Sequence, residues 1–139
     1  MYRVLMPVDT DEERSLKQAE YVSSLPGSDT DVEAIILFIF QDDDEELPEG
    51  FGSFKSATRV GSVRRVSEHF DEHDVAYTVL DDAGETADRI IEEANEHDVD
   101  SIVLGGRKQS PVGKALFGSV TQSVILDSDR PVVVTGADK

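Results

Sequence analysis

The stretch VEAIILFIF, residues 32–40, is almost continuously apolar. It lacks the alternation of apolar and polar residues that a half-exposed strand shows, and such a run is typical of a strand buried on both faces of a parallel sheet. The run PVVVT, residues 131–135, has the same character. These two segments predict a sheet that is covered by helices on both sides.

Three more apolar runs complete the pattern: YRVLMPV at 2–8, VAYTVL at 75–80 and SIVLG at 101–105. Between the runs, apolar residues recur at helical spacing. The stripes are Leu16, Ala19 and Val22; Val60, Val63, Val66 and Phe70; and Ala87, Ile90, Ile91 and Ala94. Alternating strands and helices predict an α/β fold with a five-stranded parallel sheet and right-handed crossovers. We expect residues 1–139 to form a single domain.

The tetrapeptide EHDV occurs at 72–75 and again at 96–99, each time between a predicted helix and the next strand. This repetition indicates one kind of turn that is used twice.

The chain is strongly acidic, with 30 Asp and Glu against 13 Lys and Arg, which gives a formal charge of −17. This charge repels nucleic acids and anionic membranes, so neither is expected as a partner. The composition resembles that of cytosolic proteins from halophilic organisms, where molar salt shortens the Debye length to ~3 Å. An ordinary acidic protein is the alternative.

Several classes of protein are not expected. The chain has no cysteine, so it can form neither disulfides nor thiolate metal sites. It shows no apolar run of membrane-spanning length, and its first residues lack the layout of a signal peptide. We therefore expect a cytoplasmic protein.

The segment GGRKQSPVGKALFGSV, residues 105–120, differs from the rest because it is rich in glycine and free of carboxylates. It carries Arg107, Lys108 and Lys114, and it leads from a predicted strand into a predicted helix. Ligands of open α/β sheets bind at the carboxyl ends of strands, and helix N-termini favour anions. With Gly118, Ser119 and Thr121 at the start of the helix, the segment predicts a phosphate cradle; the alternative is that Ser119 only caps the helix.

Three known phosphate-binding or phosphate-accepting patterns do not fit. Gly106 and Gly113 are too far apart for a Walker A motif, and Lys114 is followed by alanine rather than Ser or Thr. The dinucleotide motif G-x-G-x-x-G is absent after every predicted strand. A phospho-receiver domain would need a lysine after the last strand, where the sequence reads VVVTG.

A fourth pattern fits better. The spacing of Gly105 and the pair Gly118-Ser119 resembles the motif G-x2-G-x9-G-[ST] of the universal stress protein family. VLMPVDTDEE near the start resembles that family's first strand, and RPVVVT resembles its last. Lys108 replaces the second glycine of the motif, and its ammonium could supply the charge that a backbone amide supplies elsewhere.

The resemblance implies strand order 3-2-1-4-5, a Rossmann-like fold of the adenine nucleotide alpha hydrolase type. It also implies a regulatory or stress-response protein that binds ATP, or AMP or ADP, with or without Mg²⁺ or Mn²⁺. By the same resemblance, Asp9 would hold the ribose. The other implied binding residues are Pro7, Val8 and Ile39 around the adenine, Leu104 and Gly105 beside the sugar and phosphates, and Gly118, Ser119 and Val120 along the phosphates. The cations Arg107 and Lys108 and the hydroxyl of Thr121 are further candidates for the phosphates because of their own chemistry.

The residues themselves leave alternatives open. Asp9 follows the first strand, where a carboxylate suits a ribose diol, but it could equally cap the helix that begins near Asp11. No nucleophile or general base can be assembled, so any ATP hydrolysis should be slow. A nucleotide-free dimeric scaffold of the same family is the main rival, and a transferase or hydrolase on the same fold is a weaker one.

Three further features of the sequence each lead to a prediction. An unpaired last strand, residues 131–135, predicts a homodimer through this edge. His69 and His73 are spaced for a shared metal, but without a third ligand a solvated face explains them better. The basic cluster of Lys55, Arg59, Arg64 and Arg65 is expected to balance the acidic residues at 42–49; contact with the phosphates of a nucleotide or with a partner protein is the alternative.

Overall fold

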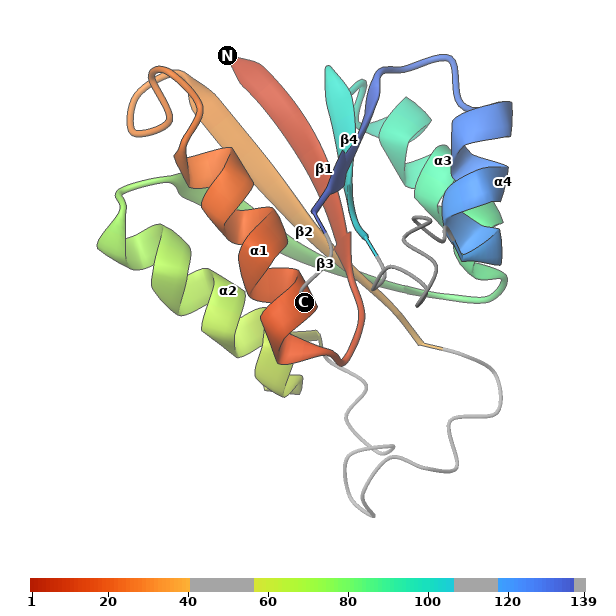
Figure 1. Ribbon diagram of the computed structural model, residues 1–139, viewed down its shortest axis with the longest axis horizontal. Coiled ribbons are helices and arrows are strands. Elements are labelled where there is room, and N and C mark those ends of the chain that lie inside the picture. Colours follow the sequence, from red (N-terminus) through yellow and green to blue (C-terminus); the bar gives the residue numbers. More distant parts are fainter. Residues whose placement is uncertain (41–56, 107–117, 137–139) are drawn as a thin grey trace, which may run out of the picture.

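The computed structural model describes residues 1–40, 57–106 and 118–136, in which strands and helices alternate (Figure 1). The strands are β1 (Tyr2–Val8), β2 (Val32–Phe40), β3 (Ala76–Ala83), β4 (Ser101–Gly105) and β5 (Val132–Thr135). The helices are α1 (Glu12–Ser23), α2 (Gly61–Glu72), α3 (Thr86–Glu96) and α4 (Ser119–Asp127), and a 3-10 turn, η1 (Ala57–Arg59), precedes α2.

The five strands form one parallel sheet in the order β3-β2-β1-β4-β5. The chain first adds β2 and β3 on one side of β1 and then β4 and β5 on the other side, so the order of addition reverses between β1 and β4. The predicted fold class and strand order are both confirmed.

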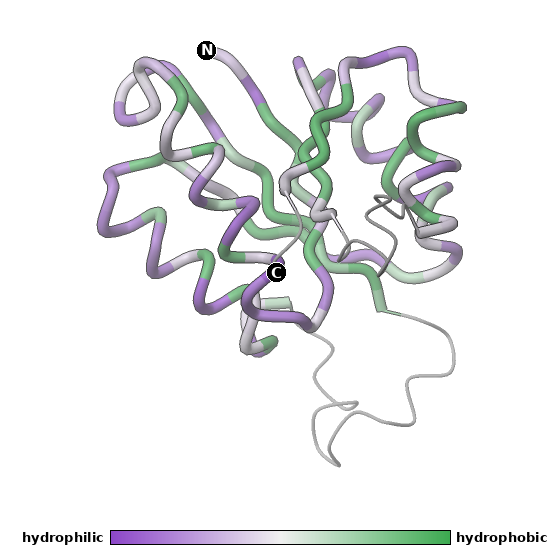
Figure 2. Tube along the Cα trace, viewed as in Figure 1, coloured by the Kyte–Doolittle hydropathy of each residue, from purple (hydrophilic) through white to green (hydrophobic). Residues whose placement is uncertain are grey.

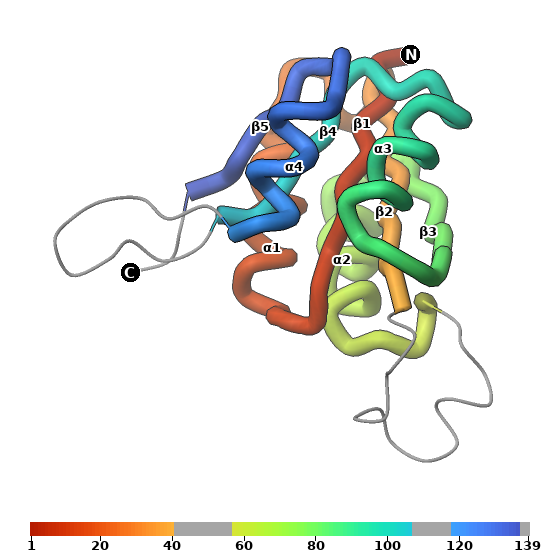
Figure 3. The backbone as a smooth tube through the Cα atoms, turned by 90° about the vertical axis from the view of Figure 1, so that its right-hand side faces the viewer, coloured from red at the N-terminus to blue at the C-terminus, as the bar shows by residue number. Residues whose placement is uncertain are grey.

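Helices cover both faces of the sheet (Figures 1 and 3). α1 and α2 pack on one face, where Met6 and Ile36 lie fully buried, and α3 and α4 pack on the other, against Leu5 and Leu37. Successive residues of a strand point to opposite faces, so a strand between two helical layers needs an apolar side chain at every position. That requirement accounts for the unbroken run of β2, and Figure 2 shows the apolar strands between helices that are polar on the outside.

Two elements differ from the expectation. β3 continues to Ala83, past the predicted end at Leu80, because it pairs with β2 as far as Phe40↔Ala83. Asp81 and Asp82 are tolerated in it because β3 is an edge strand. In α1 the buried stripe consists of Ser15, Gln18, Ala19 and Val22. Leu16 is only half-buried, so polar side chains face the sheet where an apolar stripe was predicted.

The two EHDV segments form the same helix end, as predicted. Asp74 and Asp98 both adopt the left-handed backbone conformation, with φ of 58° and 49°. Aspartate enters this region more readily than most residues. The amide of the following valine then bonds back to the helix, Val75 to Phe70 at 3.0 Å and Val99 to Ala94 at 3.2 Å. Both valines are buried, which completes a Schellman-type end.

Candidate functional site

The sheet opens between β1 and β4 at the carboxyl ends of the strands. β1 stays paired with β2 along its length, to Val8↔Phe38, but its pairing with β4 consists of Val4↔Ser101 and Leu5↔Ile102. Beyond these pairs the two strands separate, as strands do at the reversal point of a doubly wound sheet. The separation creates a crevice.

A cavity of about 610 Å³ occupies this crevice, a volume in the usual range for small-molecule sites. The described residues that line it come from the ends of β1, β2 and β4, from α1, and from the starts of α3 and α4. They are Pro7, Val8, Asp9, Thr10, Arg14, Gln18, Leu37, Phe38, Ile39, Thr86, Ile90, Leu104, Gly105, Gly118, Val120 and Thr121.

Gln18 joins the two separated strands. Its side-chain amide donates hydrogen bonds to the carbonyl of Pro7 at 2.7 Å and to that of Val103 at 3.0 Å. Gln18 is buried, so both bonds replace strand-to-strand bonds that the separation has removed. A buried glutamine in α1 therefore holds the crevice open at a fixed width.

Asp9 lies at the mouth of the crevice, directly after β1. One carboxylate oxygen, Oδ1, accepts a hydrogen bond from the backbone amide of Asp11 at 2.9 Å. Its backbone carbonyl accepts a bond from Ser62 Oγ at 2.5 Å. Asp9 does not cap α1, because Asp11 is the capping residue and accepts a bond from the amide of Arg14 at 3.0 Å.

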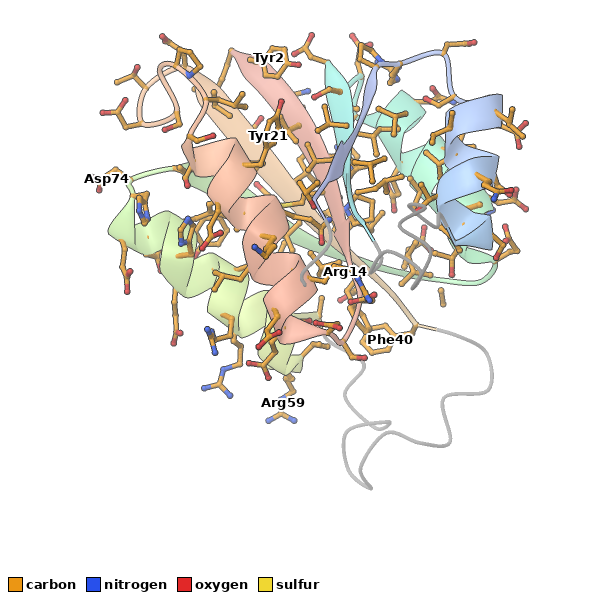
Figure 4. The ribbon with its side chains drawn as sticks, viewed as in Figure 1. Tyr2, Arg14, Tyr21, Phe40, Arg59 and Asp74 are labelled. Carbon is orange, nitrogen blue, oxygen red and sulfur yellow. The ribbon has the colours of Figure 1, made fainter. Side chains whose placement is uncertain are left out.

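Arg14, in the first turn of α1, reaches across the crevice mouth (Figure 4). Its Nη1 pairs with Oδ2 of Asp9 at 2.6 Å, and its Nε donates a bond to the carbonyl of Gly106 at 3.3 Å. Among the lining residues that the structure describes, Asp9 and Arg14 are the charged ones.

Gly105, the first glycine of the motif, is needed for space rather than for an unusual φ. A Cβ atom here would lie 2.7 Å from Cδ of Arg14 and closer still to Cγ. No real contact of this kind is so short, so any larger residue would displace the arginine. The stem of Arg14 thus packs flat against the end of β4.

α4 begins opposite this group. Gly118 is its N-cap, and no side chain caps the helix, so the alternative of a capping Ser119 is not observed. Ser119 is exposed and is not among the lining residues, whereas Gly118, Val120 and Thr121 are. The first backbone amides of α4 have no acceptor within the helix, so they can donate hydrogen bonds to an anion.

Sequence reasoning brought most of these residues together and missed others. It identified the lining residues Pro7, Val8, Asp9, Ile39, Leu104, Gly105, Gly118, Val120 and Thr121. The predicted Ser119 does not line the cavity, and Arg107, Lys108 and Lys114 lie outside the described residues. It missed Arg14 and Gln18, which make the hydrogen bonds described above, and also Thr10, Leu37, Phe38, Thr86 and Ile90. Gln18 lies four residues before Val22 of the predicted stripe, so it shares that face, whereas nothing in the sequence distinguishes Arg14 from the charged residues around it.

The histidine pair lies away from the cavity, between α1 and α2. The rings of His69 and His73 stack with centroids 4.1 Å apart, and Nε2 of His69 lies 2.9 Å from Oγ of Ser23. Burial, and then the neighbouring His73, lower the pKa of His69. Among residues 1–40, 57–106 and 118–136, no three metal-ligating side chains cluster together.

The basic cluster of α2 is partly explained. Arg65 lies 3.5 Å from Glu12 of α1, so it balances an acid of the neighbouring helix. Lys55 and the acidic segment 42–49 lie outside the described residues, and the expected pairing with that segment stays a prediction. In the part of the chain that is described, no helix is long and apolar enough to span a membrane.

Comparison with known proteins identifies the family. The sequence profile described as "Universal stress protein family" matches residues 1–136. A universal stress protein of Mycolicibacterium smegmatis is 30% identical over 76 residues, which cover 54% of this chain and 58% of that protein. The match thus spans little more than half the length of this curated relative.

Solved structures share the fold over nearly the whole chain. A universal stress protein from Archaeoglobus fulgidus superposes with a TM-score of 0.77 at 22% identity, covering 98% of this chain and 99% of its own. A family member from Arabidopsis thaliana, solved with AMP bound, gives 0.70 at 18% identity and covers 99% and 93%. A protein from Archaeoglobus fulgidus in complex with dAMP gives 0.68 at 16% identity and covers 98% of each chain.

Proposed function

The chain belongs to the universal stress protein family, and on that premise we propose that it binds ATP or a related adenine nucleotide in the crevice between β1 and β4. The observation that carries the proposal is the composition of the cavity. Its lining combines an apolar slot, a carboxylate and the start of a helix, which match the base, the sugar and the phosphates of a nucleotide. Structures of relatives with AMP or dAMP bound support the same ligand class.

Each part of the nucleotide has a proposed partner. The adenine lies against Pro7, Val8 and Ile39, and the ribose hydroxyls donate to Asp9. Leu104 and Gly105 flank the sugar. The phosphates receive hydrogen bonds from the first amides of α4 after Gly118, with Arg107 and Lys108 supplying positive charge. Mg²⁺ or Mn²⁺ could accompany the phosphates, since a triphosphate carries oxygen ligands of its own.

The proposed role is regulatory rather than catalytic, in a stress response. The described cavity residues include no histidine and no serine beside a base, so they offer no activated nucleophile. Any hydrolysis of bound ATP should therefore be slow. We expect the protein to act by adopting or exposing a nucleotide-dependent surface.

We further propose that two copies of the single-domain protein pair through β5 in the cytoplasm. β5 is the last strand of the described sheet, and Val132, Val133 and Val134 are only half-buried in one copy. A second copy would bury these valines and pair the open strand edge.

The test is nucleotide retention and calorimetric titration with ATP in buffer rich in KCl. Gly118→Val should abolish binding, because its side chain blocks the approach to the first amides of α4. Asp9→Asn should weaken it about tenfold or more, as expected for a lost hydrogen bond to a charged group. Asp29→Asn is the matched control, since Asp29 is exposed in the turn after α1.

The outcome separates this function from its rival. If wild-type protein and the Gly118→Val variant both fail to bind ATP, AMP and ADP, the protein is a nucleotide-free scaffold. Rapid turnover of ATP would instead favour an enzyme.

A further inference from the structure

Among the described residues that line the cavity, Arg14 is the basic one. It stands out in a chain whose carboxylates greatly outnumber its basic residues. Its guanidinium does not point freely into the crevice toward an anion. It pairs with Asp9 Oδ2 at 2.6 Å, lies 3.5 Å from Asp11 Oδ2 and donates to the carbonyl of Gly106 at 3.3 Å. Three acceptors from two elements of the crevice therefore fix its position.

The stem of Arg14 is held as firmly as its head. Cγ and Cδ pass over Gly105, where no Cβ atom could fit beneath them. About a quarter of the side chain is exposed, which leaves it accessible to a ligand and yet restricted to one path. A guanidinium held on this path has a fixed plane and can orient a carboxylate in a way that a flexible ammonium cannot.

The consequence falls on Asp9. Oδ1 accepts from the amide of Asp11 at 2.9 Å and Oδ2 accepts from Arg14, so both oxygens are fixed in space. A carboxylate can accept about four hydrogen bonds, so about two acceptor positions stay available. The Asp9 side chain is 55% exposed, and these positions are open to a ligand.

We infer that Arg14 is a positioning residue that fixes the Asp9 carboxylate to receive a vicinal diol, and so gives the site a preference for ribose over deoxyribose. The inference rests on the proposed nucleotide binding. It assigns to Arg14 a role that acts through Asp9 rather than through the phosphates. A carboxylate held in one orientation accepts two neighbouring hydroxyls together, whereas a freely rotating one gains little from the second hydroxyl.

The experiment compares the affinity for ATP with that for 2′-deoxy-ATP, and the affinity for ATP with that for adenosine, in KCl-rich buffer. Wild-type protein should prefer ATP over its 2′-deoxy form by about tenfold or more. In Arg14→Met, which keeps an apolar stem over Gly105, the preference should fall to within about threefold of unity, as in Asp9→Asn. The ratio of ATP to adenosine affinity should stay nearly as in wild type.

Two further variants test whether the effect is specific to the guanidinium of Arg14. Arg65→Met removes the same charge from a pair with Glu12 outside the cavity, and it should keep the wild-type preference. Arg14→Lys should fold even if the methionine variant does not. Because lysine lacks the planar fork, it should still lose at least threefold of the preference.

Three results would contradict the inference about Arg14. If Arg14→Met weakens ATP binding strongly but leaves adenosine binding and the ribose preference intact, Arg14 is a phosphate ligand and the inference is wrong. An unchanged preference in both Arg14 variants would also overturn it, while nucleotide binding itself would stand. If the wild-type protein binds no nucleotide at all, the proposed function fails and the inference fails with it.

Discussion

The two ends of the β1–β4 pair use arginine in opposite ways. At the amino end, where β1 and β4 are paired, Arg3 forms a salt bridge with Glu33 at 2.9 Å and donates a hydrogen bond to the carbonyl of His97 at 2.7 Å. Its backbone also exchanges bonds with Asp100. At the carboxyl end, where the strands separate, Arg14 holds a carboxylate at the edge of a cavity.

The difference comes from what the backbone leaves unsatisfied. At the amino end β1 and β4 are paired, and the arginines there bond to acceptors of neighbouring elements. Arg130 does the same there, with Asp98 and the carbonyl of Val99 as acceptors. At the carboxyl end the two strands no longer pair. Gln18 of α1 donates hydrogen bonds to the carbonyls of Pro7 and Val103, and Arg14 donates to that of Gly106. The same type of side chain therefore joins neighbouring elements at one end and orients a carboxylate beside the cavity at the other.

The largest expected effect comes from removing the polar bridge that holds the open end. Gln18→Met keeps the side-chain length but leaves the carbonyls of Pro7 and Val103 without their donor. We expect the free energy of unfolding to fall by about 2–3 kcal/mol, the cost of unpaired buried acceptors. Urea denaturation measures this. Glu13→Met, an exposed change on the same helix, should stay within about 0.5 kcal/mol of wild type. A similar loss in both variants would contradict the bridging role.

An arginine at the amino end should affect stability and not binding. Arg130→Met removes bonds to Asp98, Asn95 and the carbonyl of Val99, and should lower the free energy of unfolding by about 1–2 kcal/mol. Its affinity for ATP should match that of wild type. If Arg130→Met weakened ATP binding as much as Arg14→Met does, the contrast between the two ends would be lost.

A single methyl group at the open end should have the reverse effect. Gly105→Ala places a Cβ atom against the stem of Arg14 and should push the arginine off Asp9. We expect ATP binding to weaken about tenfold, or about 1.4 kcal/mol. Gly136→Ala is the matched control, because a Cβ atom there meets nothing within 4 Å. Equal affinities in the two alanine variants would show that Arg14 does not depend on Gly105.

The smallest effect is expected at the contact between α1 and α2, away from the cavity. Burial and the neighbouring His73 lower the pKa of His69 in the folded protein, below its ordinary value of 6.5. The unfolded chain therefore binds the proton more readily. The contribution of His69 to stability is full above pH 6.5 and is lost as the pH falls through the folded pKa.

In His69→Gln this acid-side loss should shrink, with a change of under about 1 kcal/mol between pH 7 and pH 5. Thermal melting at a series of pH values measures it, and ATP affinity should not change. A steeper acid-side loss in the variant than in wild type would contradict the assigned direction.

The sequence predicted the sheet well because its signal is local. VEAIILFIF must be buried on both sides wherever it lies, and its bounds in the structure are those predicted, Val32–Phe40. The EHDV turns were equally readable, since an aspartate that adopts a positive φ needs only its immediate neighbours. The order of the strands was not local, and it came from the family resemblance.

The cavity was harder to predict because its polar partners are far apart in the chain. Asp9 could be placed at the end of a strand, but its partner Arg14 was indistinguishable from the charged residues around it. Gln18 was missed because the helical stripe was expected to be apolar. Its role depends on two carbonyls that lose their strand partners only in three dimensions.

The most direct measurement is a structure of the protein determined with ATP at saturating concentration. The account predicts the adenine against Pro7, Val8 and Ile39, a ribose hydroxyl within hydrogen-bond distance of Asp9, and the phosphates at the first turn of α4. An empty crevice, or a nucleotide bound elsewhere on the surface, would contradict it.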